Sequence, residues 1–84
     1  MNKILTTNLI KVIKSCNTEE ELKELLIGLF TPQELEVVDT RLEIVKQLKR
    51  GKSQRAIAEE LGVGIATVTR GAREVKQGRF EVIK

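Results

Sequence analysis

The chain has almost no aromatic side chains: among its 84 residues there is no tryptophan, no tyrosine and only two phenylalanines. It also has no histidine, and its one cysteine, Cys16, excludes an intrachain disulfide. These residues are too few for a conventional zinc site, so we expect no metal. Cys16 falls in an apolar helical stripe, where a small core hydrophobe is its ordinary role. With no nucleophile beside a base and no carboxylate pair that marks a pocket, we expect that the chain is not an enzyme.

A long apolar run is also missing. No segment approaches the roughly 18 apolar residues of a membrane span, and no signal peptide is visible. We therefore expect a cytoplasmic protein with no membrane partner, and the single cysteine fits a reducing compartment. Hydrophobic residues make up 40% of the chain and charged residues 32%, which is typical of a small globular domain. A helical domain of this length buries a marginal core alone, so we expect oligomerisation.

The net charge of +3 conceals an asymmetry between the two halves of the chain. Residues 1–45 hold five Lys or Arg and eight Asp or Glu, a balance of −3, whereas residues 46–84 hold ten and four, a balance of +6. A basic segment of this kind is attracted to a polyanion such as DNA. A solvated basic face is the alternative interpretation, and it is disfavoured because the basic half also contains the motif described below.

Hydrophobic periodicity predicts an all-α domain of about five helices. The first helix is expected over residues 3–15, with an apolar face wide enough to suggest burial on two sides. Thr18 and Glu21 form a Thr-x-x-Glu capping box at the start of a second helix. Leucines at helical spacing carry this second helix to about Leu29.

The third helix has the strongest start signal in the sequence. Thr31-Pro32-Gln33-Glu34 combines a capping box with proline at the first helical position. We expect the helix to run to about Arg50 and to end at Gly51. The segment Arg79–Lys84, after the last helix, is too short for a sheet and is interpreted as a frayed or packed tail. The apolar seam of the third helix consists of Leu35, Val38, Leu42 and Val45, with Val37, Ile44 and Leu48 alongside.

The segment Ser53–Lys76 is typical of a helix-turn-helix. Gln54–Leu61 gives the first short helix, Gly62 supplies the positive φ at which that helix stops, and Val63 fills the turn. Ala58 is small where the two helices cross. An ordinary corner between two core helices is the alternative interpretation. The second helix has the inward stripe Ile65, Val68, Ala72 and Val75.

The outward face of that second helix mixes short side chains, which fit a DNA groove, with cations, which are attracted to phosphates. This mixture predicts a recognition helix that binds double-stranded DNA. The residues concerned are Ala66, Thr67, Thr69, Arg70 and Arg73.

The octapeptide Gly64-Ile-Ala-Thr-Val-Thr-Arg-Gly71 resembles the recognition-helix signature of the bacterial Trp repressor family. Ser53-Gln-Arg55 before it, and Thr31-Pro32 and Thr40-Arg41 further upstream, extend the resemblance over roughly Leu29 to Lys76. It implies a sequence-specific repressor that binds an operator as a homodimer with intertwined amino-terminal helices. Residues 1–30 would then be the dimerisation helices, and residues 31–84 the core helix plus helix-turn-helix of one overall domain.

The same resemblance implies two sets of site residues and L-tryptophan as corepressor. Without it, the spacing of Arg41 fits equally well an arginine that reaches solvent along the apolar side of its helix. The expected DNA-binding residues are Arg55, Gly64, Ile65, Ala66, Thr67, Thr69, Arg73 and Lys76. The expected ligand-binding residues are Thr31, Arg41, Arg70, Gly71 and Glu74.

Three residues depart from the familiar pocket of the family: Gly28 and Phe30 replace aliphatic residues, and Glu74 replaces a serine. Glu74 could pair with the ammonium group of a ligand, or it could repel a carboxylate and change the ligand. Two other functions therefore stay open, a ligand-independent DNA-binding regulator of the same fold and a helical protein-binding module. The family's long last helix has no counterpart in the short tail.

Overall fold

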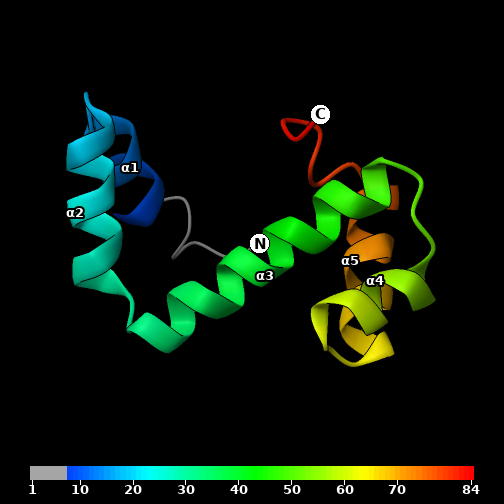
Figure 1. Ribbon diagram of the computed structural model, residues 1–84. Helices are drawn as coiled ribbons and strands as arrows, with labels where there is room; N and C mark the ends of the chain where they lie inside the picture. The colour runs from blue at the N-terminus through cyan, green and yellow to red at the C-terminus, as the bar shows by residue number, and fades with distance from the viewer. Residues whose placement is uncertain (1–7) are drawn as a thin grey trace. The chain divides into compact units, whose positions relative to one another are not determined.

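The computed structural model describes residues 8–84, and within this range it contains helices and no strand (Figure 1). This confirms the predicted all-α fold with five helices, while the intertwined dimer stays a prediction. The helices are α1 (Ile10–Ser15), α2 (Glu19–Leu29), α3 (Pro32–Lys49), α4 (Gln54–Leu61) and α5 (Ile65–Lys76).

The chain divides into two compact units, one that ends at Leu35 and one that comprises Glu36–Lys84. The first unit contains α1, α2 and the first turn of α3. The second contains the rest of α3, α4, α5 and the tail. The predicted division by role, at residues 30 and 31, stays a prediction.

In the first unit, α1 is shorter than the predicted helix over residues 3–15. It begins at Ile10, and residues 3–7 lie outside the described part of the chain. The cap of α2 is present: the hydroxyl of Thr18 accepts a hydrogen bond from the Glu21 N–H at 3.1 Å. The carboxylate of Glu21 accepts its bond from the Asn17 N–H, at 2.6 Å, and not from that of Thr18 as a standard capping box requires.

The apolar faces of α1 and α2 are largely uncovered. No residue of either helix is buried, and Ile27 and Leu29 are 60% and 55% exposed. The predicted burial of the first helix on two sides is therefore wrong for the single chain, because two short helices alone cannot enclose a core. A shallow apolar cleft between them is lined by Asn8, Leu9, Val12, Leu25 and Leu29.

The start of α3 confirms the predicted capping box. The Thr31 N–H donates to Oε1 of Glu34 at 2.9 Å, and the Glu34 N–H donates to Oγ1 of Thr31 at 3.1 Å. Pro32 occupies the first helical position, where its missing N–H costs no bond. The helix ends at Lys49, one residue before the predicted end, and Gly51 follows in the left-handed conformation.

The second unit has a small core in which α3, α4 and α5 meet. Each fully buried aliphatic side chain there contributes roughly 1.5–3 kcal/mol through the hydrophobic effect. Four predicted apolar positions of this unit are not part of it: Val37, Val38, Leu42 and Ile65 are 39–52% exposed. Ile65 opens α5, and helical side chains lean toward the amino terminus, so its side chain extends past the core. The buried core residues are Ile44, Ile57 and Val68, with Val45 also buried and Leu48, Ala58, Leu61 and Val63 packed around them.

Candidate DNA-binding face and ligand pocket

Local signals place α4 and α5 as a helix-turn-helix. The hydroxyl of Ser53 caps α4 by accepting the Ala56 N–H at 3.1 Å. Gly62 ends the helix at a φ of +67°, which is the left-handed conformation predicted for it. The two helices then pack through Ile57 and Val68, whose side chains are fully buried. Because this packing uses one side of α5, the opposite side of α5 is left at the surface.

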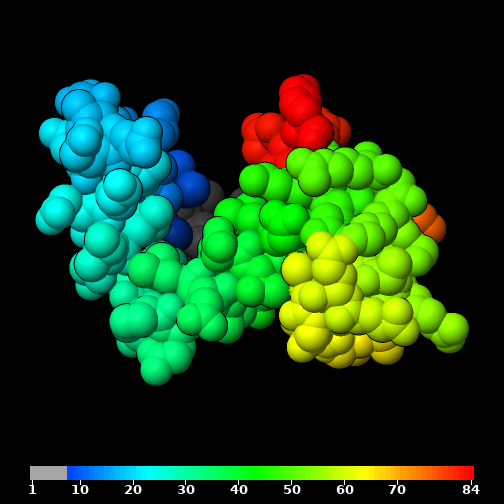
Figure 2. Space-filling model, viewed as in Figure 1, coloured from blue at the N-terminus to red at the C-terminus, as the bar shows by residue number. Residues whose placement is uncertain are grey.

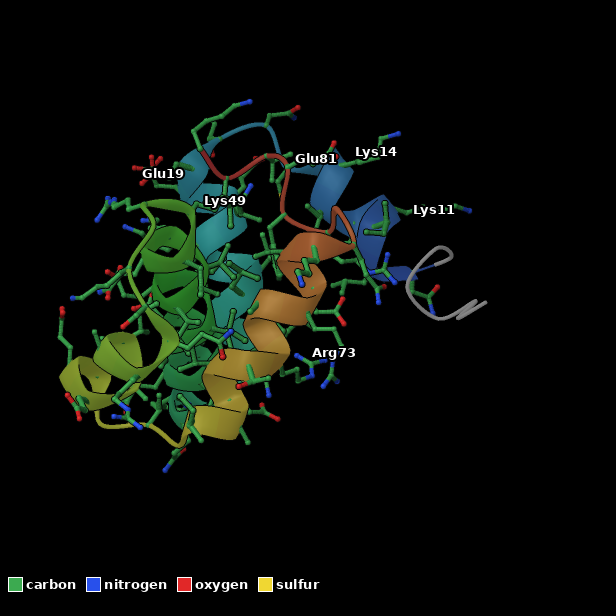
Figure 3. The ribbon with its side chains drawn as sticks, turned by 90° about the vertical axis from the view of Figure 1, so that its right-hand side faces the viewer. Lys11, Lys14, Glu19, Lys49, Arg73 and Glu81 are labelled. Atoms are coloured by element: carbon green, nitrogen blue, oxygen red, sulfur yellow. The ribbon has the colours of Figure 1, made fainter. Side chains whose placement is uncertain are left out.

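The outer side of α5 presents most of the predicted DNA-binding residues to solvent. Lys76 and Arg55, the latter on α4, are also exposed, and neither forms an ion pair with another described residue. Arg73 extends outward from α5 (Figure 3). A Cβ added at Gly64 would meet no atom within 4 Å, so the backbone is open at the start of the helix. The exposed residues at the start and outer face of α5 are Gly64, Ile65, Ala66, Thr67, Arg70, Arg73 and Lys76.

Thr69 differs from the other predicted contact residues because it is half-buried and already hydrogen-bonded. Its hydroxyl donates to Oε1 of Gln54 at 2.8 Å, which links α5 to the first residue of α4. A hydroxyl that donates one bond retains lone pairs that can accept another. Gln54 was not predicted as a site residue, and only its place in the Ser53-Gln-Arg55 triplet pointed to it.

A pocket of about 120 Å³ lies between α3 and α5. This volume is well above the roughly 10–15 Å³ that one water molecule requires. Four of the five predicted ligand-binding residues line it: Arg41, Arg70, Gly71 and Glu74. The fifth, Thr31, belongs to the first unit, where it caps α3. The lining residues that the sequence did not indicate as ligand contacts are Ile44, Val45, Thr67 and Phe80.

Gly71 allows α5 to come close to α3 at the floor of this pocket. A Cβ at this position would lie 3.2 Å from Cγ2 of Ile44 and 3.6 Å from Cδ1 of Leu48. Any larger side chain would therefore push the two helices apart or move Ile44. Gly71 is therefore required because it has no side chain, and not because of its backbone conformation.

The charges around the pocket favour an anionic group. Arg41 and Arg70 are exposed, and neither forms an ion pair with another described residue. Glu74 is paired with Arg79, with 3.2 Å between Oε1 and Nε. The pocket therefore presents two available guanidinium groups and one compensated carboxylate. Guanidinium planes stack on flat rings and bind carboxylates, which suits a planar molecule with a carboxylate.

The comparison with known families agrees with this geometry. The model of the family described as Trp repressor protein matches residues 5–82. The chain belongs to the Trp repressor family. Membership in this family of regulators confirms that the chain is a repressor-like regulator and not an enzyme.

Curated relatives of this Trp repressor family member carry the name Trp operon repressor homolog. The one from Vibrio cholerae is 44% identical over 68 residues, which cover 80% of this chain and 66% of the relative. Those from Vibrio campbellii and Photobacterium profundum are 42% and 40% identical, over 81% and 80% of this chain and 69% and 66% of their own length. The chain thus spans about two thirds of the length of these relatives. No solved structure matches it significantly.

One further property concerns membranes. Within residues 8–84, no helix combines the length and the apolar character that crossing a bilayer requires.

Proposed function

We propose that this Trp repressor family member is a sequence-specific DNA-binding repressor that acts as a homodimer with L-tryptophan, or a close relative, as corepressor. The pocket between α3 and α5 carries the proposal. It has Arg41 and Arg70 at its edge, and Arg70 lies on the helix that carries the DNA-facing residues. A ligand wedged there would fix the recognition helix against α3 and favour the DNA-competent conformation.

The DNA-binding part of the proposal is supported by the exposed outer face of α5. Ala66 and Thr67 are short enough to approach base edges in a major groove, and Ile65 extends beside them. The cations Arg55 and Lys76 are free to bind phosphates. If Thr69 contacts a base, replacing it should change base preference at a cost of roughly 1–3 kcal/mol. An unchanged preference would mean that α5 enters the groove in another orientation.

The dimer is supported by the exposed apolar faces of α1 and α2, where Ile10, Val12, Ile27 and Leu29 are 44–60% exposed. Several large apolar side chains exposed on two neighbouring helices favour an interaction surface there. We expect an obligate homodimer. Light scattering that showed a folded monomer at micromolar concentration would exclude it.

The ligand part of the proposal is tested by calorimetric titration of L-tryptophan, with and without a DNA duplex that the protein selects from a random library. Linkage requires each ligand to tighten the other by the same factor, typically about 5–150-fold. Arg70→Ala should abolish the tryptophan signal, because it removes one of the two guanidinium groups. In Glu74→Ser, a gain of tryptophan binding would show that the pocket is intact but suited to another molecule.

Two outcomes would point to other functions. If millimolar tryptophan gave no heat and no change in DNA affinity, the protein would be a ligand-independent regulator of the same fold. DNA binding measured at two salt concentrations separates both regulators from a protein-binding helical module. A DNA-binding protein displaces counterions from the phosphates, so its affinity for duplex DNA falls steeply as salt rises, whereas a protein-binding module would not bind the duplex.

A further inference from the structure

The residues that follow α5 turn back toward the ligand pocket. Gly78 has a φ of +81°, and its N–H donates to the Val75 carbonyl at 3.0 Å. The N–H of Arg79 donates to the Glu74 carbonyl at 3.1 Å. These two bonds form a Schellman motif, which ends a helix and reverses the chain. The reversal brings the tail, Arg79–Lys84, onto the carboxyl-terminal part of α3 (Figure 2).

One lysine of α3 anchors the tail. The ammonium group of Lys49 donates to the carbonyl oxygens of Phe80 and Ile83, the second bond measuring 2.7 Å. The Ile83 N–H donates to the same Phe80 carbonyl at 3.1 Å, which closes a turn around the lysine. Lys49, at the end of α3, and Glu81, within this turn, are labelled in Figure 3. A half-buried lysine with two carbonyl acceptors holds the backbone at Phe80 in one place.

The anchored tail brings two chemical groups to the pocket. Phe80 is half-buried and lines the pocket together with Arg41 and Arg70. The guanidinium group of Arg79 pairs with the carboxylate of Glu74, which also lines the pocket. An aromatic amino acid has the same two groups, an aromatic ring and a cation, in addition to its carboxylate.

We propose that the tail occupies part of the ligand pocket in cis and competes with the ligand, with Phe80 in the place of its ring and Arg79 in the place of its ammonium group. This inference rests on the proposed ligand binding. A ligand that carries an ammonium group must displace Arg79 to pair with the carboxylate of Glu74. A ligand without an ammonium group does not form this ion pair. Arg79 and Phe80 thereby determine how tightly ligands bind and which ones are preferred.

The size of the effect follows from the fraction of molecules in which the tail has left the pocket. The apparent dissociation constant equals the intrinsic constant divided by that fraction. If the tail covers the pocket in about nine molecules of ten, removing the cover tightens binding by about tenfold. The exposed Arg79 side chain suits a reversible cover, because its ion pair with Glu74 is 63% exposed on the arginine side and such pairs are weak.

The experiment is calorimetric titration with two probes, L-tryptophan and 3-(indol-3-yl)propanoate, which is the same molecule without its amino group. Phe80→Ala should tighten both probes about tenfold, because the ring obstructs both. Arg79→Gln should tighten tryptophan more than 3-(indol-3-yl)propanoate, because only the ammonium group of tryptophan can pair with the carboxylate of Glu74 that this variant releases. Val82→Ala is the matched control in the tail, since Val82 is 88% exposed, and should change neither affinity. Weaker or unchanged binding in Phe80→Ala would overturn the proposal, since the ring would then be a wall of the site or unrelated to it.

A second measurement observes the tail without any ligand. 4-Fluorophenylalanine replaces both phenylalanines, and Phe30→Leu identifies the Phe80 resonance in the fluorine spectrum. We expect the Phe80 resonance of the folded protein to differ from that of the urea-unfolded chain. In Lys49→Met, which removes the anchor of the tail, the Phe80 resonance should move toward the unfolded value. A resonance already at the unfolded value would overturn the proposal. If tryptophan bound to no variant, the corepressor proposal would fail, and the fluorine spectrum alone would decide whether the tail occupies the pocket.

Discussion

Replacement of Gly71 by alanine tests how closely α5 approaches α3. Inside a helix, alanine is more favourable than glycine by about 0.8–1 kcal/mol, so helix propensity alone predicts stabilisation. Packing predicts the reverse, because the new Cβ would lie 3.2 Å from Cγ2 of Ile44. Ile44 is 1% exposed and must shift to accept the new methyl group, and overpacking a core typically costs about 1–3 kcal/mol. The net expectation is a loss of about 0–2 kcal/mol in the free energy of unfolding.

Gly28→Ala is the matched control for this prediction. Gly28 lies in α2, and a Cβ there would meet no atom within 4 Å, so the same substitution should stabilise by about 0.5–1 kcal/mol. The difference between the two variants isolates the contact with Ile44. Urea unfolding followed by circular dichroism measures it, at one fixed chain concentration because a dimer's stability depends on concentration. If both variants were stabilised equally, α5 would not approach α3 as closely as the structure has it.

Three other predictions concern the DNA-binding half. Gln54→Ala removes the hydrogen bond that positions Thr69, so the binding free energy for DNA should weaken by roughly 0.5–1.5 kcal/mol, with an altered preference at one base pair. Equal weakening on all single-base variants of the DNA site would contradict this role. Lys76→Ala should weaken all sequences about equally and flatten the salt slope by about one, whereas Lys11→Ala, on α1, should leave the slope unchanged. Ile57→Ala should lower the free energy of unfolding by about 2–5 kcal/mol in urea titrations, because Ile57 is fully buried; a loss below 1 kcal/mol would mean that the core is not packed around it.

Most helix boundaries could be predicted because their signals are local. Ser53 and Gly62 bound α4 through a side-chain cap and a left-handed conformation, both of which depend on residues within one turn. Exposure was less predictable, as Ile65 and Leu42 show. Periodicity identifies which face of a helix is apolar, but it does not say whether another element covers that face. Periodicity likewise does not say what covers the apolar faces of α1 and α2, which a second copy of the chain would cover in the proposed dimer.

In the candidate site, too, local features could be predicted from the sequence, whereas contacts between distant residues could not. Arg41 and Arg70 were joined only through the family resemblance, since no local pattern relates residues that far apart. The contact between Lys49 and Phe80 spans 31 residues and belongs to a tail in which the resemblance gives no guidance. The reversal at Gly78 is local, but the lysine that then holds the tail lies on another helix, where no local pattern indicates it. Assays limited to the family's pocket residues would therefore measure a ligand affinity that already includes competition from the tail. Variants at Arg79 and Phe80 are needed to separate the intrinsic affinity of the pocket from the fraction of molecules in which it is open.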